Sequence, residues 1–310
     1  MQKTNENNAF LSQPGLIISY FGSSVAVEAT DGQVFQCHLR RNQELPVVGD
    51  RVHFQLGQDN TGIITSILPR RTMLARANTH GGKMKPIAAN LDILLIIMAP
   101  PPIFSEHLVD RYLIAAELLK ITPILVVNKM DLLDERGKEA LEKRLLPYRQ
   151  VPYIVILSSI YYPNGLQELA THLKNKTSAL VGPSGVGKSS IIAALNQSEL
   201  IRVGEVSAKG AGKHTTTATR LYHLPDGGDL IDSPGVREFN LWPVSKQEIL
   251  AGFREFQPFI NSCKFRDCQH IVEPGCAVQA AISDGKISPQ RFASYQELLK
   301  EVAVPNHKNR

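Results

Sequence analysis

The stretch Gly182-Pro183-Ser184-Gly185-Val186-Gly187-Lys188-Ser189 decides how the rest of the chain is interpreted. A glycine, four residues and then Gly-Lys-Ser is the spacing of loops that bind nucleotide phosphates. The apolar run 178–181 precedes this stretch, and the segment 189–196 that follows has helical spacing. The sequence therefore predicts a strand, a glycine-rich turn and a helix N-terminus, whose converging N–H groups and dipole favour an anion. A turn that merely connects two elements is the alternative.

The side chains of this loop have distinct expected roles. Lys188 is expected to reach the β- and γ-phosphates of a nucleotide and to act in catalysis. The Ser189 hydroxyl is expected to ligate Mg²⁺, and Ser190 completes the predicted nucleotide contacts. These roles make the nucleotide a triphosphate with its magnesium ion.

A second motif, Asn128-Lys129-Met130-Asp131, follows the apolar run 123–127. The Asp131 carboxylate can accept hydrogen bonds from both N1–H and the 2-amino group of guanine, a donor pair that adenine lacks. Each hydrogen bond to a charged group contributes about 1.5–3 kcal/mol, enough for strong discrimination. Ser158 and Ser159 follow the next predicted strand, where a loop would brace the base. Alone the tetrapeptide could be a helix-start turn, but beside a phosphate loop it predicts guanine-nucleotide binding.

A third motif, Asp232-Ser233-Pro234-Gly235, follows the predicted strand 229–231. Asp232 can hold Mg²⁺ through water there, and the Gly235 N–H can meet a γ-phosphate. Many GTPases continue with a glutamine that orients the attacking water. Val236 stands in that position and cannot do so. Either a nearby polar group or a partner must supply this function.

The segment 203–220 shows no apolar periodicity and is too long for a plain connection. We predict a switch loop that becomes ordered when a threonine hydroxyl meets Mg²⁺ and the γ-phosphate. The spacing does not select among its three consecutive threonines, and Thr216 is the candidate. His214 is the candidate for orienting the water; the alternative is that His214 only touches phosphate or RNA.

The order of these motifs predicts a circular permutation. Within 91–242, strand-like and helix-like segments alternate, which favours a parallel sheet covered on both faces. In an ordinary GTPase the phosphate loop comes first and the Asn-Lys-x-Asp motif near the end. Here the guanine motif and the Ser158-Ser159 pair both precede the phosphate loop. The sheet can be unchanged while its termini have moved, because termini lie at the surface.

Residues 15–72 have the pattern of a small β-barrel. Apolar and polar residues alternate in short runs separated by turn signals, which is typical of half-buried antiparallel strands. An OB-fold is the commonest small barrel that binds nucleic acid. Residues 73–90 then form a predicted basic linker. No acidic residue lies between Asp59 and Asp92, whereas five basic residues do: Arg70, Arg71, Arg76, Lys83 and Lys85. This stretch fits contacts with a phosphate backbone and a solvated linker equally well.

The C-terminal residues 243–310 are mostly helical by pattern and contain a cluster of possible metal ligands: Cys263, Cys268, His270 and Cys276. Three thiolates and one imidazole make a closed structural zinc site. The alternative is three unrelated buried thiols beside a surface histidine, and the short spacing favours zinc. Cys37, in the predicted barrel, is most simply a buried thiol.

The composition is that of an ordinary globular protein. The 310 residues carry a net charge of +5, and 43% are hydrophobic. The polar N-terminus has no apolar core of a signal peptide, and the strongest apolar run is too short to cross a bilayer. We therefore expect a cytoplasmic protein without a membrane partner. We also expect the protein to be a monomer. Clustered cysteines in that compartment favour metal over disulfides.

A permuted GTPase between a β-barrel and a Cys/His zinc unit resembles the ribosome small subunit-dependent GTPase A family (RsgA, also called YjeQ). The resemblance covers roughly residues 15–300, and barrel and zinc motif together separate it from other permuted GTPases. It implies GTP hydrolysis to GDP, coupled to late maturation of the 30S ribosomal subunit, with contacts to its 16S rRNA. Residue patterns alone give only a GTP-binding enzyme with a nucleic-acid partner. The remaining alternatives are a nucleotide kinase, another permuted-GTPase assembly factor, and a non-enzymatic RNA-binding module that holds GTP.

Overall fold

A computed structural model of the chain describes residues 12–39, 44–57, 59, 61–77, 84–100, 104–196, 219–233 and 244–303. The chain forms two compact units, each made of segments that are distant in sequence. The first comprises Met1–Asp92, Ala170–Leu180 and Ile192–Glu238. The second comprises Ile93–Leu169, Val181–Ile191 and Phe239–Arg310. Within the described residues, none of the helices combines the length and the apolar character needed to cross a lipid bilayer.

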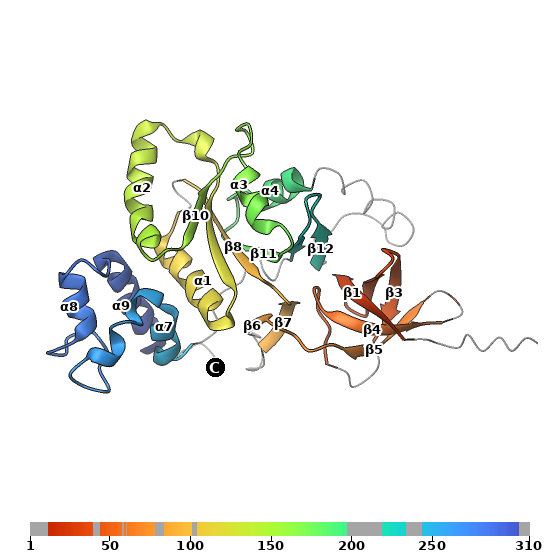
Figure 1. Cartoon of the computed structure of the whole chain (residues 1–310), viewed down its shortest axis with the longest axis horizontal. Coiled ribbons are helices and arrows are strands. Elements are labelled where there is room, and N and C mark those ends of the chain that lie inside the picture. Colours follow the sequence, from red (N-terminus) through yellow and green to blue (C-terminus); the bar gives the residue numbers. More distant parts are fainter. Residues whose placement is uncertain are drawn as a thin grey trace, which may run out of the picture. The chain divides into compact units, whose positions relative to one another are not determined.

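The first unit contains a closed five-stranded barrel (Figure 1). Its strands are β1 (Gln13–Tyr20), β2 (Ser24–Ala29), β3 (Val34–His38), β4 (Arg51–Leu56) and β5 (Gly62–Ile67). They pair in the order β1-β2-β3-β5-β4, and β4 pairs back with β1 to close the barrel. Only the β3–β5 pair is parallel among these. The small β-barrel predicted from the sequence is therefore confirmed.

The barrel core follows from the alternation seen in the sequence. Val52 and Phe54 of β4 are fully buried, whereas Arg51, the first residue of β4, is exposed. Cys37 is also fully buried and forms no disulfide. A Cβ atom on Gly62 would lie 2.4 Å from its sulfur, so only glycine allows β5 to pack this closely against β3. The prediction of a buried thiol at Cys37 is confirmed.

Strands also occur where the sequence indicated a basic linker. β6 (Met73–Ala77) and β7 (Met84–Ala89) form a separate antiparallel pair, anchored by buried Leu74 and Ala88. The sequence window suggested that the preceding arginines have no acidic partners, but in the structure they do. Arg70 is bound to Asp50 and Glu44, and Arg71 pairs with Asp92 at 2.8 Å. Arg70 therefore fastens the end of the barrel and is not available for phosphate; Lys83 lies outside the described residues.

Three further strands of the first unit are β11 (Thr177–Val181), β12 (Thr219–His223) and β13 (Asp229–Asp232). β11 and β13 are parallel, as the β-α alternation predicted. β12 is antiparallel to β13, and its other edge pairs with β1 of the barrel through Ser19–Arg220 and Tyr20–Thr219. The sequence did not predict β12, because only Leu221 in it is buried and no alternation is visible.

The second unit contains parallel strands β8 (Ile93–Met98), β9 (Thr122–Val127) and β10 (Ile154–Leu157). β8 is buried along its whole length. The connecting helices are α1 (Glu106–Leu119) and α2 (Glu135–Gln150), which begin after the N-caps Ser105 and Asp134. α3 (Gln167–Leu173) leads to β11, and α4 (Lys188–Leu195) follows the phosphate loop. These elements confirm the predicted β-α alternation.

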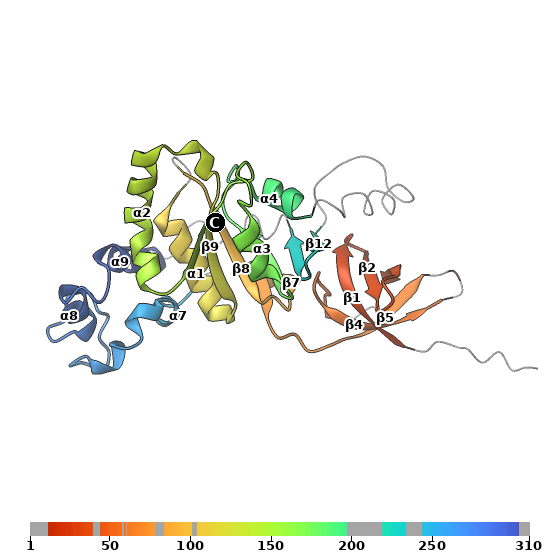
Figure 2. The same ribbon diagram turned by 45° about the horizontal axis from the view of Figure 1, so that its top comes forward.

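Helices make up the C-terminal part of the second unit, as the sequence pattern predicted. They are α7 (Lys246–Gly252), η2 (Arg254–Phe256), η3 (Ile260–Ser262), α8 (Ala277–Ser283) and α9 (Pro289–Ala303). Rings of Phe253, Phe256 and Tyr295 pack together with centroids 5.0–5.4 Å apart. Figures 1 and 2 show α7 and α9 beside α1, and both helices contact it. The final helix begins at Pro289.

Candidate nucleotide site and metal centre

The predicted phosphate loop lies between a buried strand and a helix. β11 ends at Val181, and α4 begins at Lys188. Val186 is fully buried and anchors the loop, whereas Ser189 and Ser190 in the first turn of α4 are exposed. The local structure therefore matches the strand, turn and helix N-terminus predicted for this stretch, with its hydroxyls accessible.

Two glycines of this loop cannot be replaced. Gly182 has a φ of +138°, and a Cβ atom there would lie 2.1 Å from the Ile97 carbonyl oxygen. Gly187 has a φ of +97°, and its Cβ would lie 2.4 Å from the Asn128 side-chain nitrogen. Both values lie in the region where L side chains are strained, and both contacts are shorter than real Cβ contacts. The loop can therefore take this path only with glycine at both positions.

Lys188 is nine-tenths buried and folds back over the loop. Its ammonium donates to the carbonyl oxygens of Gly182 at 2.7 Å and Pro183 at 2.6 Å. These hydrogen bonds compensate for taking a charged group out of water. They hold the ammonium at the N-terminus of α4, where the sequence predicted a cation for nucleotide phosphates.

Asn128 connects the predicted guanine motif to the phosphate loop. Its side-chain N–H donates to the Val186 carbonyl oxygen at 2.9 Å. Its backbone N–H donates to the carbonyl oxygen of Met98 in β8 at 2.8 Å. The Ser158 hydroxyl donates to the Asn128 side-chain oxygen at 3.4 Å. Asn128 and Ser158 are both almost fully buried. Three predicted loops are thereby brought together at the carboxyl ends of neighbouring strands.

The remaining residues of the guanine motif are held by the loop after β10. The backbone N–H of Met130 donates to the Ser158 carbonyl oxygen at 3.1 Å. The Ser159 hydroxyl donates to the Asp131 carboxylate and accepts from the Tyr161 N–H at 3.1 Å. Lys129 has a left-handed backbone with φ +63°, and its side-chain stem lies near Gly187 of the phosphate loop. Asp131 is thus fixed in orientation by a serine that the sequence had also singled out.

The third motif is described only in part. Asp232 ends β13, one residue beyond the Ala179–Ile231 pair with β11. The Ser233 hydroxyl is buried and accepts a hydrogen bond from the Thr219 hydroxyl at 2.8 Å. Gly235 and Val236 lie outside the described residues, as do His214 and Thr216. The predicted roles of these four residues stay predictions.

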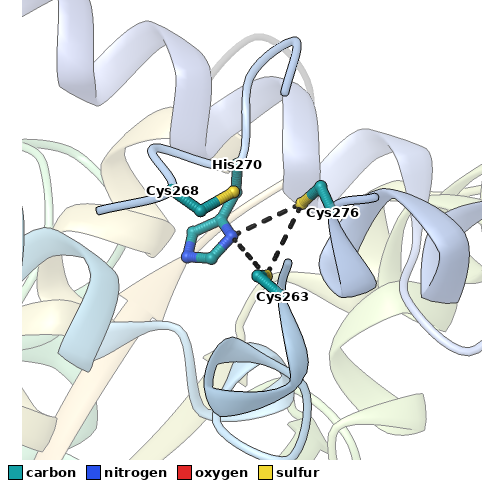
Figure 3. Close-up of side chains that lie close together, drawn as sticks. All are labelled: Cys263, Cys268, His270 and Cys276. Carbon is teal, nitrogen blue, oxygen red and sulfur yellow. Dashed lines mark hydrogen bonds between the residues drawn. The ribbon is translucent and has the colours of Figure 1, made fainter. Parts of the chain in front are cut away.

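The four predicted metal ligands converge on one point in the second unit (Figure 3). Their ligand atoms all lie within 4.8 Å of one another. His270 Nδ1 is 3.5 Å from the sulfurs of both Cys263 and Cys276, and those sulfurs are 4.0 Å apart. A tetrahedral zinc ion with Zn–S of about 2.3 Å and Zn–N of about 2.0 Å separates its donors by about 3.5–3.8 Å. The donor set and its spacing therefore fit a structural metal ion.

Residues around the cluster fix the ligands in place. His270 is buried in a left-handed conformation, and burial lowers its pKa, which favours the neutral imidazole that a metal requires. The Ala277 N–H donates to the Cys263 sulfur at 3.4 Å. Glu273 accepts from the N–H groups of Gln269, Ile271 and Val272 and so closes the turn that carries His270. Glu273 is a supporting residue that the sequence analysis missed, because its role is visible only in backbone hydrogen bonds.

Comparison with known proteins matches this arrangement. A model of the RsgA GTPase family matches residues 67–242, more than half of the chain. The chain belongs to the RsgA GTPase family. A relative in Pseudomonas putida, "Small ribosomal subunit biogenesis GTPase RsgA", is 46% identical over 300 residues, which cover 95% of this chain and 87% of that protein.

Two solved structures of RsgA-like proteins also resemble the whole chain. YjeQ from Thermotoga maritima has a TM-score of 0.79 and 29% identity, covering 96% of this chain and all of that chain. YloQ, described as a circularly permuted GTPase, has a TM-score of 0.75 and 27% identity, with both chains fully covered. The RsgA resemblance and the permuted P-loop fold with its flanking barrel and Cys/His unit are therefore confirmed.

Proposed function

We propose that this RsgA-family GTPase hydrolyses GTP to GDP and phosphate and couples this reaction to late maturation of the small ribosomal subunit. The observation that carries the proposal is the hydrogen bond from Asn128 to Val186, which joins a guanine-reading motif to a phosphate loop. Adenine-specific kinases have no use for such a base motif. The ribosomal partner is supported by relatives named as small ribosomal subunit biogenesis GTPases.

The proposed roles of the nucleotide-site residues follow their positions. Asp131, held by Ser159, reads the guanine edge, while Asn128 and Ser158 keep the base loops in register with the phosphate loop. Lys188 faces the β- and γ-phosphates. Ser189 and, through water, Asp232 would hold Mg²⁺, which neutralises charge developing on the phosphates when bound. His214, Thr216 and Gly235 complete the proposed site.

A positively charged strand pair supports an RNA partner. Arg76 of β6 and Lys85 of β7 lie directly opposite each other in the antiparallel register, and both are exposed. Like charges in facing positions destabilise a strand pair. A phosphate group of 16S rRNA between them would turn this repulsion into attraction. We propose Arg76 and Lys85, rather than the ion-paired Arg70, as the contacts of this stretch with rRNA.

The Cys/His cluster is proposed to hold zinc, because three thiolates and an imidazole in a closed tetrahedron are typical of structural zinc. We also propose that the protein acts in the cytoplasm, where ribosomal subunits mature, and that it does so as a monomer. Metal analysis of purified protein tests the zinc site, with one zinc per chain as the expected result. Light scattering tests whether the protein is a monomer.

The decisive experiment measures GTP turnover with and without purified 30S subunits. Val236 stands in place of the usual glutamine, so we expect slow hydrolysis by the protein alone and strong acceleration by 30S. Affinity for 30S should also differ between the GTP-analogue and GDP forms, and by linkage 30S changes nucleotide affinity by the same factor. Equal 30S affinity for both forms, with no stimulation of hydrolysis, would overturn the coupling. Binding without turnover in any condition would favour the non-enzymatic module.

A further inference from the structure

Gln269, the residue before the metal ligand His270, has both of its backbone groups hydrogen-bonded. Its N–H donates to the Glu273 carboxylate at 2.8 Å, and its carbonyl oxygen accepts from the Tyr295 hydroxyl at 3.2 Å. Glu273 belongs to the same loop, whereas Tyr295 lies on α9, 26 positions further along the chain. A helix outside the metal-ligand segment therefore helps to fix the direction in which the chain enters His270.

His270 depends on this support because of its backbone conformation and because of the atom that it offers. Its φ is +61°, an uncommon value for a residue other than glycine, which persists only where the surroundings impose it. Its Nδ1 atom lies 3.5 Å from the sulfurs of both Cys263 and Cys276 (Figure 3). Nδ1 is the ring nitrogen nearer to the backbone. A rotation of the peptide between Gln269 and His270 would therefore move Nδ1 away from the two sulfurs.

Tyr295 is itself held in a buried aromatic cluster. Its side chain is almost fully buried, and its ring meets the rings of Phe253 and Phe256 edge-on, with centroids 5.4 and 5.2 Å away. Edge-to-face pairs at these distances are favourable and depend on the orientation of the rings. The packing therefore directs the Tyr295 hydroxyl at one point of the metal-ligand segment.

The same helix is anchored one turn earlier. Arg291 and Tyr295 are four residues apart and share a face of α9. The Arg291 guanidinium lies over the Phe253 ring at 4.5 Å, and it forms buried ion pairs with Asp110 of α1 and, at 2.6 Å, with Glu255. Breaking a buried ion pair leaves an uncompensated charge, so α9 resists rotation. Ion pairs that involve no metal ligand thus hold Tyr295 in place.

We propose that Tyr295 is a positioning residue for the metal centre, whose hydroxyl fixes the peptide before His270 and thereby holds Nδ1 where a metal ion binds. This inference rests on the proposed zinc site and assigns it a further residue. Tyr295 offers no ligand to the metal; it acts through Gln269. Residues that hydrogen-bond to metal ligands change metal affinity by about 10–100-fold, and a bond to the neighbouring peptide belongs at the lower end.

The test compares Tyr295→Phe with Tyr153→Phe in the full-length, zinc-loaded protein. Both substitutions remove one phenol hydroxyl from a buried tyrosine of the second unit and keep the ring. The Tyr153 hydroxyl, however, has no hydrogen-bond partner within the described residues. Competition with a chromophoric chelator measures the affinity for Zn²⁺. Tyr295→Phe should weaken zinc binding by about ten-fold, and Tyr153→Phe should match wild type.

A cobalt spectrum separates positioning from a general loosening of the C-terminal helices. Co²⁺ can be loaded in place of Zn²⁺, and its visible absorption bands depend on the identity and geometry of its ligands. Bound Co²⁺ should give an altered spectrum in Tyr295→Phe, because His270 is no longer held in one orientation. Tyr153→Phe should reproduce the wild-type spectrum. Loss of packing alone would lower the unfolding midpoint and leave the spectrum of bound Co²⁺ unchanged.

The outcomes distinguish this inference from the zinc site on which it rests. If wild type binds Zn²⁺ but Tyr295→Phe binds it within two-fold of wild type, the positioning role is wrong while the zinc site stands. A loss of affinity with an unchanged Co²⁺ spectrum, or equal losses in the Tyr295 and Tyr153 variants, would also overturn the positioning role. A wild-type chain that binds neither metal overturns both proposals.

Discussion

The metal cluster and the nucleotide loops lie in the same unit but are built from different ranges of sequence. The four metal ligands come from one short segment, 263–276, whereas the Asn128–Val186 hydrogen bond joins residues 58 positions apart. The nucleotide loops are placed by parallel strands, so their geometry exists before any ligand binds. The thiols and imidazole are placed by turns, and a bound cation is needed to offset the clustering of their lone pairs. The fold thus holds the nucleotide loops in place, whereas we expect a metal ion bound to the Cys/His cluster to hold the surrounding chain in place.

Loss of the metal should therefore have the largest effect. Cys268→Ser should abolish stoichiometric zinc and unfold the segment around the cluster, because binding of structural zinc contributes about 10–16 kcal/mol in small zinc domains. Metal analysis and proteolysis of the C-terminal region are the measurements. Cys37→Ser is the control, since Cys37 is buried in the barrel and should leave metal content unchanged. A variant that stays folded without metal would show that the cluster does not organise its surroundings.

Lys188→Ala tests the nucleotide site, which the fold is expected to hold in place without a ligand. GTP affinity should fall at least about 100-fold, since several charge-assisted contacts are lost, whereas the circular dichroism spectrum and unfolding midpoint should hardly change. Titration with a fluorescent GTP analogue measures the first quantity. Lys143→Ala, on the exposed side of α2, is the matched control. A variant that binds GTP normally would remove the phosphate-loop assignment, and one that unfolds would show that this site, too, supports the fold.

Asp131→Asn should change which base is bound rather than whether a nucleotide binds. The amide reverses the donor and acceptor pattern, so the preference should move from guanine to xanthine. Each hydrogen bond between the base and the charged carboxylate contributes about 1.5–3 kcal/mol to the discrimination. Competition between GTP and XTP measures the change. Ser159→Ala, which removes the hydroxyl that supports Asp131 and accepts from the Tyr161 N–H, should weaken binding without altering the preference. Surviving guanine selectivity in Asp131→Asn would mean that another residue reads the base.

The smallest effect is expected at the contact between β12 and β2, which joins residues far apart in the sequence and involves no metal. His223 of β12 contacts Asp229 of β13 and Glu28 of β2, each at 2.7 Å, and these carboxylates raise the pKa of His223 to about 10. Because the pKa is raised on folding, this stabilisation is fully present below the unfolded value of about 6.5 and is lost as pH rises through 10. The groups are partly exposed, so about 1 kcal/mol is expected at neutral pH.

His223→Gln should accordingly lower the free energy of unfolding at pH 7, and the difference from wild type should shrink at pH 10.5. Denaturant unfolding at the two pH values measures this difference, with His38→Gln, at the exposed last residue of β3, as the control. A difference that is independent of pH would mean that the histidine contributes through packing and not through charge.

The sequence predicted the elements whose signals are local. Spacing alone predicted the phosphate loop and the guanine motif, which the structure brings together, and the four candidate metal ligands, which converge in it. Period-two alternation predicted the barrel. The misses involve partners distant in sequence. Arg70 meets Asp50 and Glu44, twenty and twenty-six positions away, so a sequence window shows it as an unopposed cation. β12 has one buried residue and gains its place from β13 and β1, which no periodicity in 219–223 could indicate.

Strand β1 serves two structures at once. Its first half closes the barrel against β4, and its last two residues cover the edge of β12. The span that matches the family model starts at residue 67, the final residue of the last barrel strand. A shortened chain beginning there would leave β12 with a bare row of backbone donors and acceptors, which readily pairs with another molecule. Removing the barrel should therefore favour self-association of the nucleotide-binding part, however complete its own motifs are.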